Sequence, residues 1–280
     1  MSFDPRVTPA RPDLAAAHLR GQVQAARFVE GTEFEVFDPV APVRRSPVPD
    51  AALETEALKG ERVTIYDEDG EGWGWGQLHS DRYVGWLPMN ALRAPGAPPT
   101  HTVTALRTIL FPGRSIKAQP VEGLPLGCRL AVIGDGGELA RLASGGFVPA
   151  RHLAPLDAAA PDFVAVAERF IGVPYLWGGK TSLGIDCSGL VQVALTACGI
   201  VCPRDSDMQR ALGSAVPAGD FATLRRGDLV FWNGHVAIMR DDATLLHANA
   251  FHMAVAAEPV REAVERISAA GSEVVAVKRL

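Results

Sequence analysis

The chain has 280 residues, of which 48% are apolar and 21% charged, and its net charge is −5. This composition excludes a disordered chain, and the acidic balance argues against a nucleic-acid binder. No apolar run reaches the ~20 residues that a membrane helix needs. The first residues lack a basic stretch followed by an apolar one, so we expect a cytoplasmic protein that does not bind membranes.

The first half of the chain predicts a short helical segment followed by two small β-domains. Residues 1–31 contain one weakly amphipathic helix, from about Arg11 to Val29, after a proline-rich start. Residues 32–95 and 100–156 consist of short strands broken by Gly, Asp and Pro, which is typical of small antiparallel barrels. Between them, APGAPPT is an extended linker.

The two β-domains end in similar motifs, Gly85-Trp86-Leu87-Pro88 and Gly146-Phe147-Val148-Pro149. This shared ending indicates a diverged tandem repeat of one barrel type. Both segments resemble bacterial SH3-like domains, in which a glycine–aromatic–aliphatic–proline strand lies near the end.

Residues 157–280 predict an α+β domain, in which helices pack on an antiparallel sheet. Asp162 is a suitable N-cap for a first helix, and a glycine-rich loop leads into a second helix, Cys187–Ala197. Gly199 follows that helix as a C-cap. Strands are then expected at 228–232, 235–240, 244–249 and 273–280.

Cys187 is a candidate nucleophile because it lies in the first turn of a helix, just after a glycine-rich loop. The N–H groups and dipole of a helix N-terminus favour negative charge, which predicts a lowered thiol pKa. The same N–H groups can stabilise the oxyanion of a tetrahedral intermediate. The other cysteines, Cys128, Cys198 and Cys202, are expected to be buried free thiols.

A cysteine nucleophile needs a base and a group that orients it, and two histidines are candidates. If the strands at 235–240 and 244–249 form a hairpin symmetric about Asp242, His235 pairs with Asn249 and Ala237 with His247. His235 and His247 are then diagonal neighbours on one face of the sheet. This arrangement predicts an imidazole next to Cys187 with a second polar group behind it.

Six motifs in the correct order resemble the NlpC-type cell-wall peptidases, which are papain-like cysteine peptidases of the α+β class. They are the loop PYLWGG (174–179), the run DCSG (186–189), the segment PRDSDMQ (203–209), the strand GDLVF (227–231), the strand start GHV (234–236) and the triplet LHA (246–248). The resemblance covers roughly residues 160–280.

The resemblance implies a role for each matching residue. Cys187 is the nucleophile, His235 the general base and then acid, and His247 the residue that orients His235. Tyr175 places its hydroxyl beside the nucleophile as an oxyanion donor. Asp186 and Trp177 hold the turn, and neither a metal nor an organic cofactor is implied.

Among these peptidases the chain looks like the group that acts inside cells on released murein peptides, because it has tandem barrels and no evident leader. The implied reaction is hydrolysis of the γ-D-glutamyl–diamino acid bond in a peptide with a free N-terminal L-Ala. Asp205 would bind the ammonium group, while Ser206 and Ser188 would bind the carboxylate of D-Glu. Tyr83 resembles a barrel residue that reaches into the pocket. Asp205 as a helix N-cap and Tyr83 as barrel surface are the structural alternatives.

Four other functions stay open at this level. The chain could be a secreted or wall-associated murein hydrolase without the free-amine requirement, or a thiol amidase or acyltransferase. It could also be a wall-binding module, or a metal or redox protein built on Cys198 and Cys202. We expect a monomer, and the sequence leaves the diamino acid open.

Overall fold

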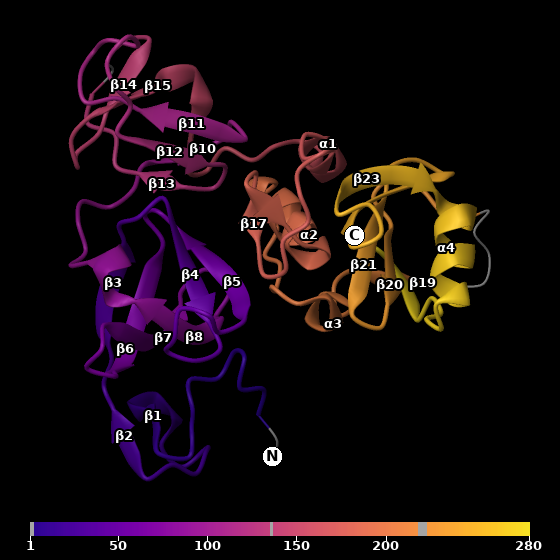
Figure 1. Cartoon of the computed structure of the whole chain (residues 1–280), viewed down its shortest axis with the longest axis horizontal. Coiled ribbons are helices and arrows are strands. Elements are labelled where there is room, and N and C mark those ends of the chain that lie inside the picture. Colours follow the sequence, from indigo (N-terminus) through magenta and orange to yellow (C-terminus); the bar gives the residue numbers. More distant parts are fainter. Residues whose placement is uncertain (1–2, 135–136, 218–222) are drawn as a thin grey trace. The chain divides into compact units, whose positions relative to one another are not determined.

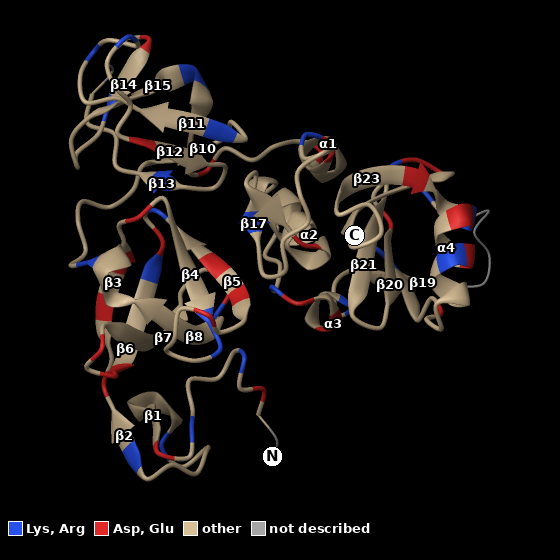
Figure 2. Cartoon of the chain, viewed as in Figure 1, with Lys and Arg blue, Asp and Glu red and all other residues tan. Residues whose placement is uncertain are grey.

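A computed structural model of the chain describes residues 3–134, 137–217 and 223–280 (Figure 1). The chain divides into two compact units, Met1–Leu156 and Asp157–Leu280. Acidic and basic residues are interspersed along both units, whereas the central strands β20 and β21 of the second unit carry none (Figure 2). Among the described residues no helix is long and apolar enough to cross a membrane.

The N-terminal segment is not the helix that we predicted. It consists of strand β1 (Leu14–Ala16), a 3-10 turn η1 (Ala17–Leu19) and strand β2 (Arg27–Val29), with β1 and β2 paired in parallel. Pro9 and Pro12 lack the N–H donors that a helix uses, and a residue before proline favours extended backbone. Leu14 is fully buried and packs with Trp75 and Val84. Tertiary packing therefore outweighs the weak helical periodicity.

Residues 32–93 form a curled antiparallel sheet in the order β5-β4-β8-β7-β6-β3-β9. Alternate residues of its strands enclose an apolar core that includes Val43, Leu78, Tyr83 and Leu87. The strands are β3 (Thr32–Val36), β4 (Val40–Arg44), β5 (Leu53–Leu58), β6 (Arg62–Glu68), β7 (Trp73–Leu78), β8 (Val84–Pro88) and β9 (Leu92–Arg93).

The described residues between 101 and 155 form three small antiparallel sheets around a second core, to which Leu58 of β5 also contributes. The strands are β10 (His101–Val103), β11 (Arg107–Leu110), β12 (Glu122–Pro125), β13 (Arg129–Leu130), β14 (Leu139–Arg141), β15 (Phe147–Pro149) and β16 (Leu153–Pro155).

The two similar sequence motifs occupy equivalent places. Strands β8 and β15, which carry them, each pair with the strand before them, β7 and β14. Each is followed by a 3-10 turn, η2 (Met89–Ala91) or η3 (Ala150–His152), and then by a short strand, β9 or β16. This common path is what a diverged tandem repeat predicts.

The second unit has a six-stranded antiparallel sheet in the order β19-β24-β20-β21-β22-β23, with helices packed against it. The α+β prediction is confirmed. Its main elements are α1 (Phe163–Glu168), α2 (Cys187–Ala197), α3 (Ser206–Gln209), β19 (Ser214–Val216), β20 (Leu229–Trp232), β21 (His235–Met239), β22 (Thr244–Asn249), β23 (Ala254–Pro259), α4 (Val260–Ala269) and β24 (Ala276–Arg279). A small hairpin, β17 (Lys180–Thr181) with β18 (Gly184–Ile185), precedes α2.

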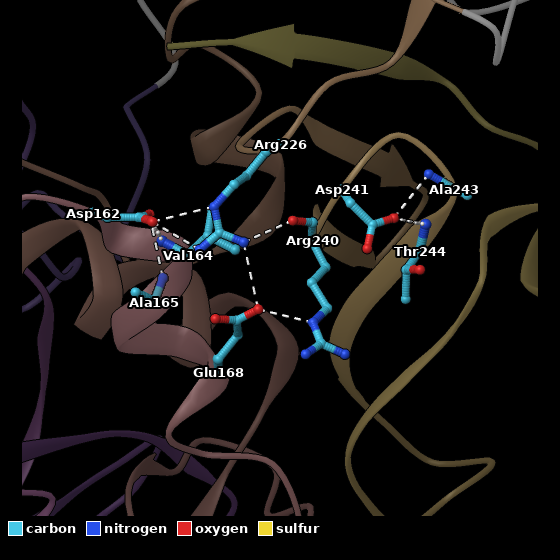
Figure 3. Close-up of polar contacts among 9 residues, drawn as sticks. All are labelled: Asp162, Val164, Ala165, Glu168, Arg226, Arg240, Asp241, Ala243 and Thr244. Atoms are coloured by element: carbon cyan, nitrogen blue, oxygen red, sulfur yellow. Dashed lines mark hydrogen bonds and ion pairs between the residues drawn. The ribbon is translucent and has the colours of Figure 1, made fainter.

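The register of the central hairpin is the predicted one. Ile238 pairs with Leu246 and Met239 with Leu245, so β21 and β22 are symmetric about Asp242. Asp241 fixes the turn, because its carboxylate accepts hydrogen bonds from the N–H groups of Ala243 and Thr244 (Figure 3). Strands β19 and β23 and helix α4 were not predicted.

A surface network of ion pairs joins α1 to the strands (Figure 3). Asp162 caps α1 by accepting from Val164 N–H at 2.8 Å, and it also accepts from Arg226 at 2.7 Å. Glu168 accepts from Arg240 at 2.8 Å. These groups are partly exposed, so the pairs contribute little individually.

Gly76 in β7 offers a test of the first sheet's packing. A Cβ there would lie 2.5 Å from the Thr64 carbonyl oxygen and 2.6 Å from Ile65 Cδ1. We expect Gly76→Ala to destabilise the first unit by about 1–3 kcal/mol, because backbone cannot yield as a flexible side chain can. Urea unfolding followed by tryptophan fluorescence measures this. Gly113→Ala, where nothing lies within 4 Å of the added Cβ, is the matched control, and equal midpoints for both variants would contradict the prediction.

Candidate active site

The start of α2 is fixed by the buried carboxylate of Asp186. As the N-cap it accepts from Gly189 N–H at 2.7 Å, and it also accepts from Gly178 N–H at 2.8 Å. Arg204 donates to both carboxylate oxygens, at 2.9 and 2.7 Å, and is only 1% exposed. Bidentate pairing of this kind satisfies two charges that are costly to bury alone. The structural role predicted for Asp186 agrees with these contacts.

Cys187 is the first residue of α2 and is 7% exposed. Helix α2 packs against β21, and the backbone N–H groups of Val236 and Ser188 act on the thiol. Burial, followed by the nearby charge of Asp186, nevertheless raises the pKa of Cys187 to about 12. The predicted lowering is therefore wrong for the free protein, because desolvation outweighs the donors at the helix N-terminus.

Behind Cys187 the sheet carries a line of hydrogen-bonded polar side chains. His235 Nε2 and His247 Nδ1 are 2.8 Å apart, and His247 Nε2 lies 2.7 Å from Glu258 Oε1. Arg266 donates to the same Glu258 oxygen at 2.5 Å. We call His235, His247 and Glu258 the His–His–Glu chain. It joins the neighbouring strands β21, β22 and β23.

The His235 ring is held in its neutral form. Burial, followed by the neighbouring His247 and Arg266, lowers the pKa of His235 to about 3. Cys187 and His235 are therefore both uncharged around neutral pH. A neutral imidazole can accept the thiol proton as the sulfur attacks, so the pair suits general-base catalysis.

Tyr175 lies in the loop before the nucleophile, where its N–H donates to the Met253 carbonyl at 2.9 Å. Burial, and then the charges of Cys187 and Asp186, raise the pKa of Tyr175 to about 12. Its phenol therefore stays protonated and can donate a hydrogen bond. Trp177, by contrast, is 62% exposed, so its side chain packs little within the turn, and its structural role stays a prediction.

The candidate substrate-binding residues lie in different environments. Ser188 is buried, where its hydroxyl accepts from Arg204 at 2.9 Å and donates to Asp186 at 3.4 Å. Binding a substrate carboxylate would require it to leave these partners. Asp205 occupies the N-cap position of α3 but makes no capping hydrogen bond with its side chain. Ser206 is the first residue of α3, and both are half-buried.

Tyr83 belongs to the core of the first unit. It is 2% exposed and packs in the apolar cluster of the first sheet, so it is not the barrel surface residue that the structural alternative described. Its role in substrate binding stays a prediction.

Glu258 and Arg266 are the members of the site that the sequence did not reveal. The pairing of His247 with Ala256 and of Leu245 with Glu258 makes Glu258 a diagonal neighbour of His247 on one face. The available signal was a single charged residue in the otherwise uncharged run AVAAEP.

The side chains of His247, His252 and Glu258 also place possible metal-ligand atoms within 4.8 Å of one another. An ion there would compete with the guanidinium of Arg266 for the same carboxylate oxygen. It would also displace the hydrogen bond between His247 and Glu258. This cluster therefore fits a hydrogen-bonded chain better than a cation site.

A buried cysteine at a helix N-terminus, packed against an antiparallel sheet that carries linked histidines, defines a papain-like cysteine hydrolase. The NlpC/P60 family model matches residues 172–268, and the bacterial dipeptidyl-peptidase Sh3 domain model matches residues 43–92. The chain belongs to the NlpC/P60 family of cysteine peptidases, as the sequence motifs predict.

Two relatives in which the match extends over most of this chain's length are named for a peptidase activity. A γ-D-glutamyl-L-lysine dipeptidyl-peptidase of Bacillus cereus (strain ATCC 10987 / NRS 248) is 30% identical over 229 residues, which are 70% of this chain and 67% of the relative. The protein of that name from Bacillus subtilis (strain 168) is 29% identical over 198 residues, 65% of each. The chain thus spans about two thirds of the length of these relatives.

A solved structure has the same fold. The crystal structure of an NlpC/P60 family protein from Bacillus cereus ATCC 10987 superposes on this chain with a TM-score of 0.73 at 23% identity. The superposition covers 89% of this chain and 99% of that one.

The buried pair of Asp186 and Arg204 predicts a large effect on stability. We expect Arg204→Met to lower the free energy of unfolding by about 3–5 kcal/mol, because it leaves a buried carboxylate without its cation. Arg226→Met is the control, since its pair with Asp162 is about 40% exposed on each side, and it should cost less than about 1 kcal/mol. Chemical denaturation of both variants measures the difference. Similar losses would show that Asp186 does not depend on Arg204.

The neutral state of Cys187 and His235 predicts the pH dependence of thiol reactivity. A raised thiol pKa leaves little thiolate below about pH 8, so alkylation of Cys187 by iodoacetamide should accelerate steadily with pH. A site holding a thiolate–imidazolium pair would instead react at a nearly constant rate from about pH 5 to about pH 8. Peptide mass spectrometry after timed quenching resolves Cys187 from the other three cysteines. A plateau in that range would contradict the prediction.

Proposed function

We propose that this protein hydrolyses the γ-D-glutamyl–diamino acid bond of murein peptides that carry a free N-terminal L-Ala, releasing L-Ala-γ-D-Glu. The observation that carries the proposal is the neutral Cys187 thiol at the start of α2, next to β21, with His235 linked to His247. Two relatives, 30% and 29% identical to this chain, are named γ-D-glutamyl-L-lysine dipeptidyl-peptidases, which supports the linkage.

The geometry supports a two-step acyl transfer. Cys187 Sγ attacks the γ-carbonyl of D-Glu while His235 accepts the thiol proton. The resulting oxyanion can be stabilised by the Cys187 N–H at the start of α2 and by the protonated Tyr175 hydroxyl. His235 then gives its proton to the leaving amine as the carbon–nitrogen bond breaks. Water hydrolyses the thioester and restores the thiol, so the reaction needs no cofactor.

Recognition of the free amine is assigned to Asp205, whose half-buried carboxylate does not cap α3. A carboxylate that binds an ammonium group discriminates strongly against an acylated amine, because the charge is then left unpaired. Ser206 and Ser188 are proposed to complete the binding of the dipeptide. We further propose a cytoplasmic monomer that acts in recycling of murein peptides.

The experiment is mass spectrometry of the purified protein incubated with L-Ala-γ-D-Glu-diaminopimelate and with its N-acetylated form. We expect cleavage of the free-amine peptide alone, since only that peptide offers the cation for Asp205. Cys187→Ala should abolish cleavage, because no other group replaces the attacking sulfur. Asp205→Asn should raise KM for the free-amine peptide by about tenfold or more, because it removes the charge partner.

Each other outcome has a distinct meaning. Cleavage of both peptides would keep the peptidase but remove the amine requirement, which favours a hydrolase of intact walls. Cleavage of neither would favour an amidase or acyltransferase on another substrate, or a wall-binding module. Turnover by Cys187→Ala would refute the mechanism itself.

A further inference from the structure

The His–His–Glu chain extends one residue further from the nucleophile than the catalytic residues that the motifs identify. Glu258 is mostly buried and contacts His247 at 2.7 Å, while His252 lies 3.9 Å from the same carboxylate oxygen. Glu258 is far from Cys187 in the sequence, yet its strand is next to the one that carries His247. Its place in the reaction follows from the direction of each hydrogen bond.

Glu258 is ionised. Burial acts to raise its pKa, but the hydrogen bond from His247 and the charge of Arg266 outweigh burial and lower it. An ionised carboxylate can only accept hydrogen bonds, so His247 Nε2 must carry the proton in this contact. In neutral His247 the other nitrogen, Nδ1, is then a lone-pair acceptor.

This assignment continues to the next ring. Because His247 Nδ1 accepts, His235 Nε2 must donate across the 2.8 Å contact. Neutral His235 then has its lone pair on Nδ1, which is the nitrogen left free to accept the proton of Cys187. The carboxylate thereby determines which nitrogen of His235 is basic, two hydrogen bonds away.

We propose that Glu258 is a positioning residue of this peptidase, which acts through His247 to hold His235 in the tautomer that accepts the thiol proton. The inference rests on the proposed cysteine-peptidase mechanism. Arg266 is part of the device, since its guanidinium hydrogen-bonds Glu258 at 2.5 Å and packs 4.2 Å from the ring centre of Phe251. Arg266 of α4 and Glu258 of β23 therefore support the base through His247.

Glu258 also favours the charged form of His235 once the thiol proton has moved. Its negative charge raises the pKa of His235, opposing the effect of Arg266. An interaction that strengthens as the imidazolium forms accelerates the chemical step and not substrate binding. The expected signature of a variant is thus a loss in kcat with little change in KM.

The test compares Glu258→Gln with Glu168→Gln in the full-length protein. Glu168 is a matched control because it also pairs with an arginine, Arg240 at 2.8 Å, in the network away from the His–His–Glu chain (Figure 3). We expect Glu258→Gln to lower kcat by about 10- to 100-fold with KM within about twofold, by analogy with carboxylates that orient metal-bound histidines. Glu168→Gln should leave both unchanged.

Two further readouts separate positioning from a merely structural role. Selective 15N-histidine labelling reports the tautomer of each ring without substrate, and Glu258→Gln should remove the exclusive Nε2–H form of His247. In a His247→Ala background, Glu258→Gln should cause no additional loss in kcat, because its effect passes through the missing ring.

The outcomes also separate this inference from the proposed function. If the wild type cleaves neither murein peptide, the proposed function fails, while the histidine tautomers and Cys187 alkylation still test Glu258. The inference would be overturned if Glu258→Gln lowered kcat as much in the His247→Ala background as it does in the wild type. It would also be overturned if Glu258→Gln lowered kcat and left the His247 tautomer unchanged. Should Glu258→Gln fail to fold, the histidine tautomers of Arg266→Met test the same arrangement, because loss of the guanidinium that holds Glu258 should weaken the exclusive Nε2–H form of His247.

Discussion

The buried carboxylate of Asp186 is the interaction on which the nucleophile side of the site depends. It joins three separate segments, through Gly178 in the Tyr175 loop, Gly189 in α2 and Arg204 before α3. The positions of Cys187, Tyr175 and Asp205 therefore follow from a single residue. Arg204 makes this possible, because a carboxylate with so little exposure to water is stable only when a cation and hydrogen bonds satisfy it.

The sheet positions the general base of the proposed mechanism in a different way, through the pairing of its strands. Neighbouring strands β21, β22 and β23 each supply one member of the His–His–Glu chain. Antiparallel pairing fixes the distance between diagonal neighbours on one face, so a strand position alone brings the rings and the carboxylate within hydrogen-bonding distance. No loop has to close for the chain to form, and the base is preorganised in the free protein.

Local signals explain which parts of this site could be predicted from the sequence. An Asp N-cap before an apolar helix places Cys187, and a short turn around Asp242 fixes the register that unites His235 and His247. Glu258 depends on a third strand whose pairing no turn signal specifies. The state of the Cys187 thiol depends on burial by distant segments, and the N-terminal segment adopts strands because Leu14 packs on Trp75. Such features arise from tertiary contacts, which outweigh local propensity.

Two carboxylate–arginine pairs thus flank the reacting pair, and they act on it in opposite ways. The charge of Asp186 raises the pKa of Cys187, which disfavours a thiolate before substrate is bound. The charge of Glu258 raises the pKa of His235, which favours the imidazolium. Burial outweighs Glu258 in the free protein, so thiol and imidazole are both neutral there. In the proposed mechanism, charge separation then coincides with formation of the substrate oxyanion, which Tyr175 and the α2 N-terminus would stabilise. A site arranged in this way stabilises the charged transition state more than it stabilises the neutral resting state of Cys187 and His235.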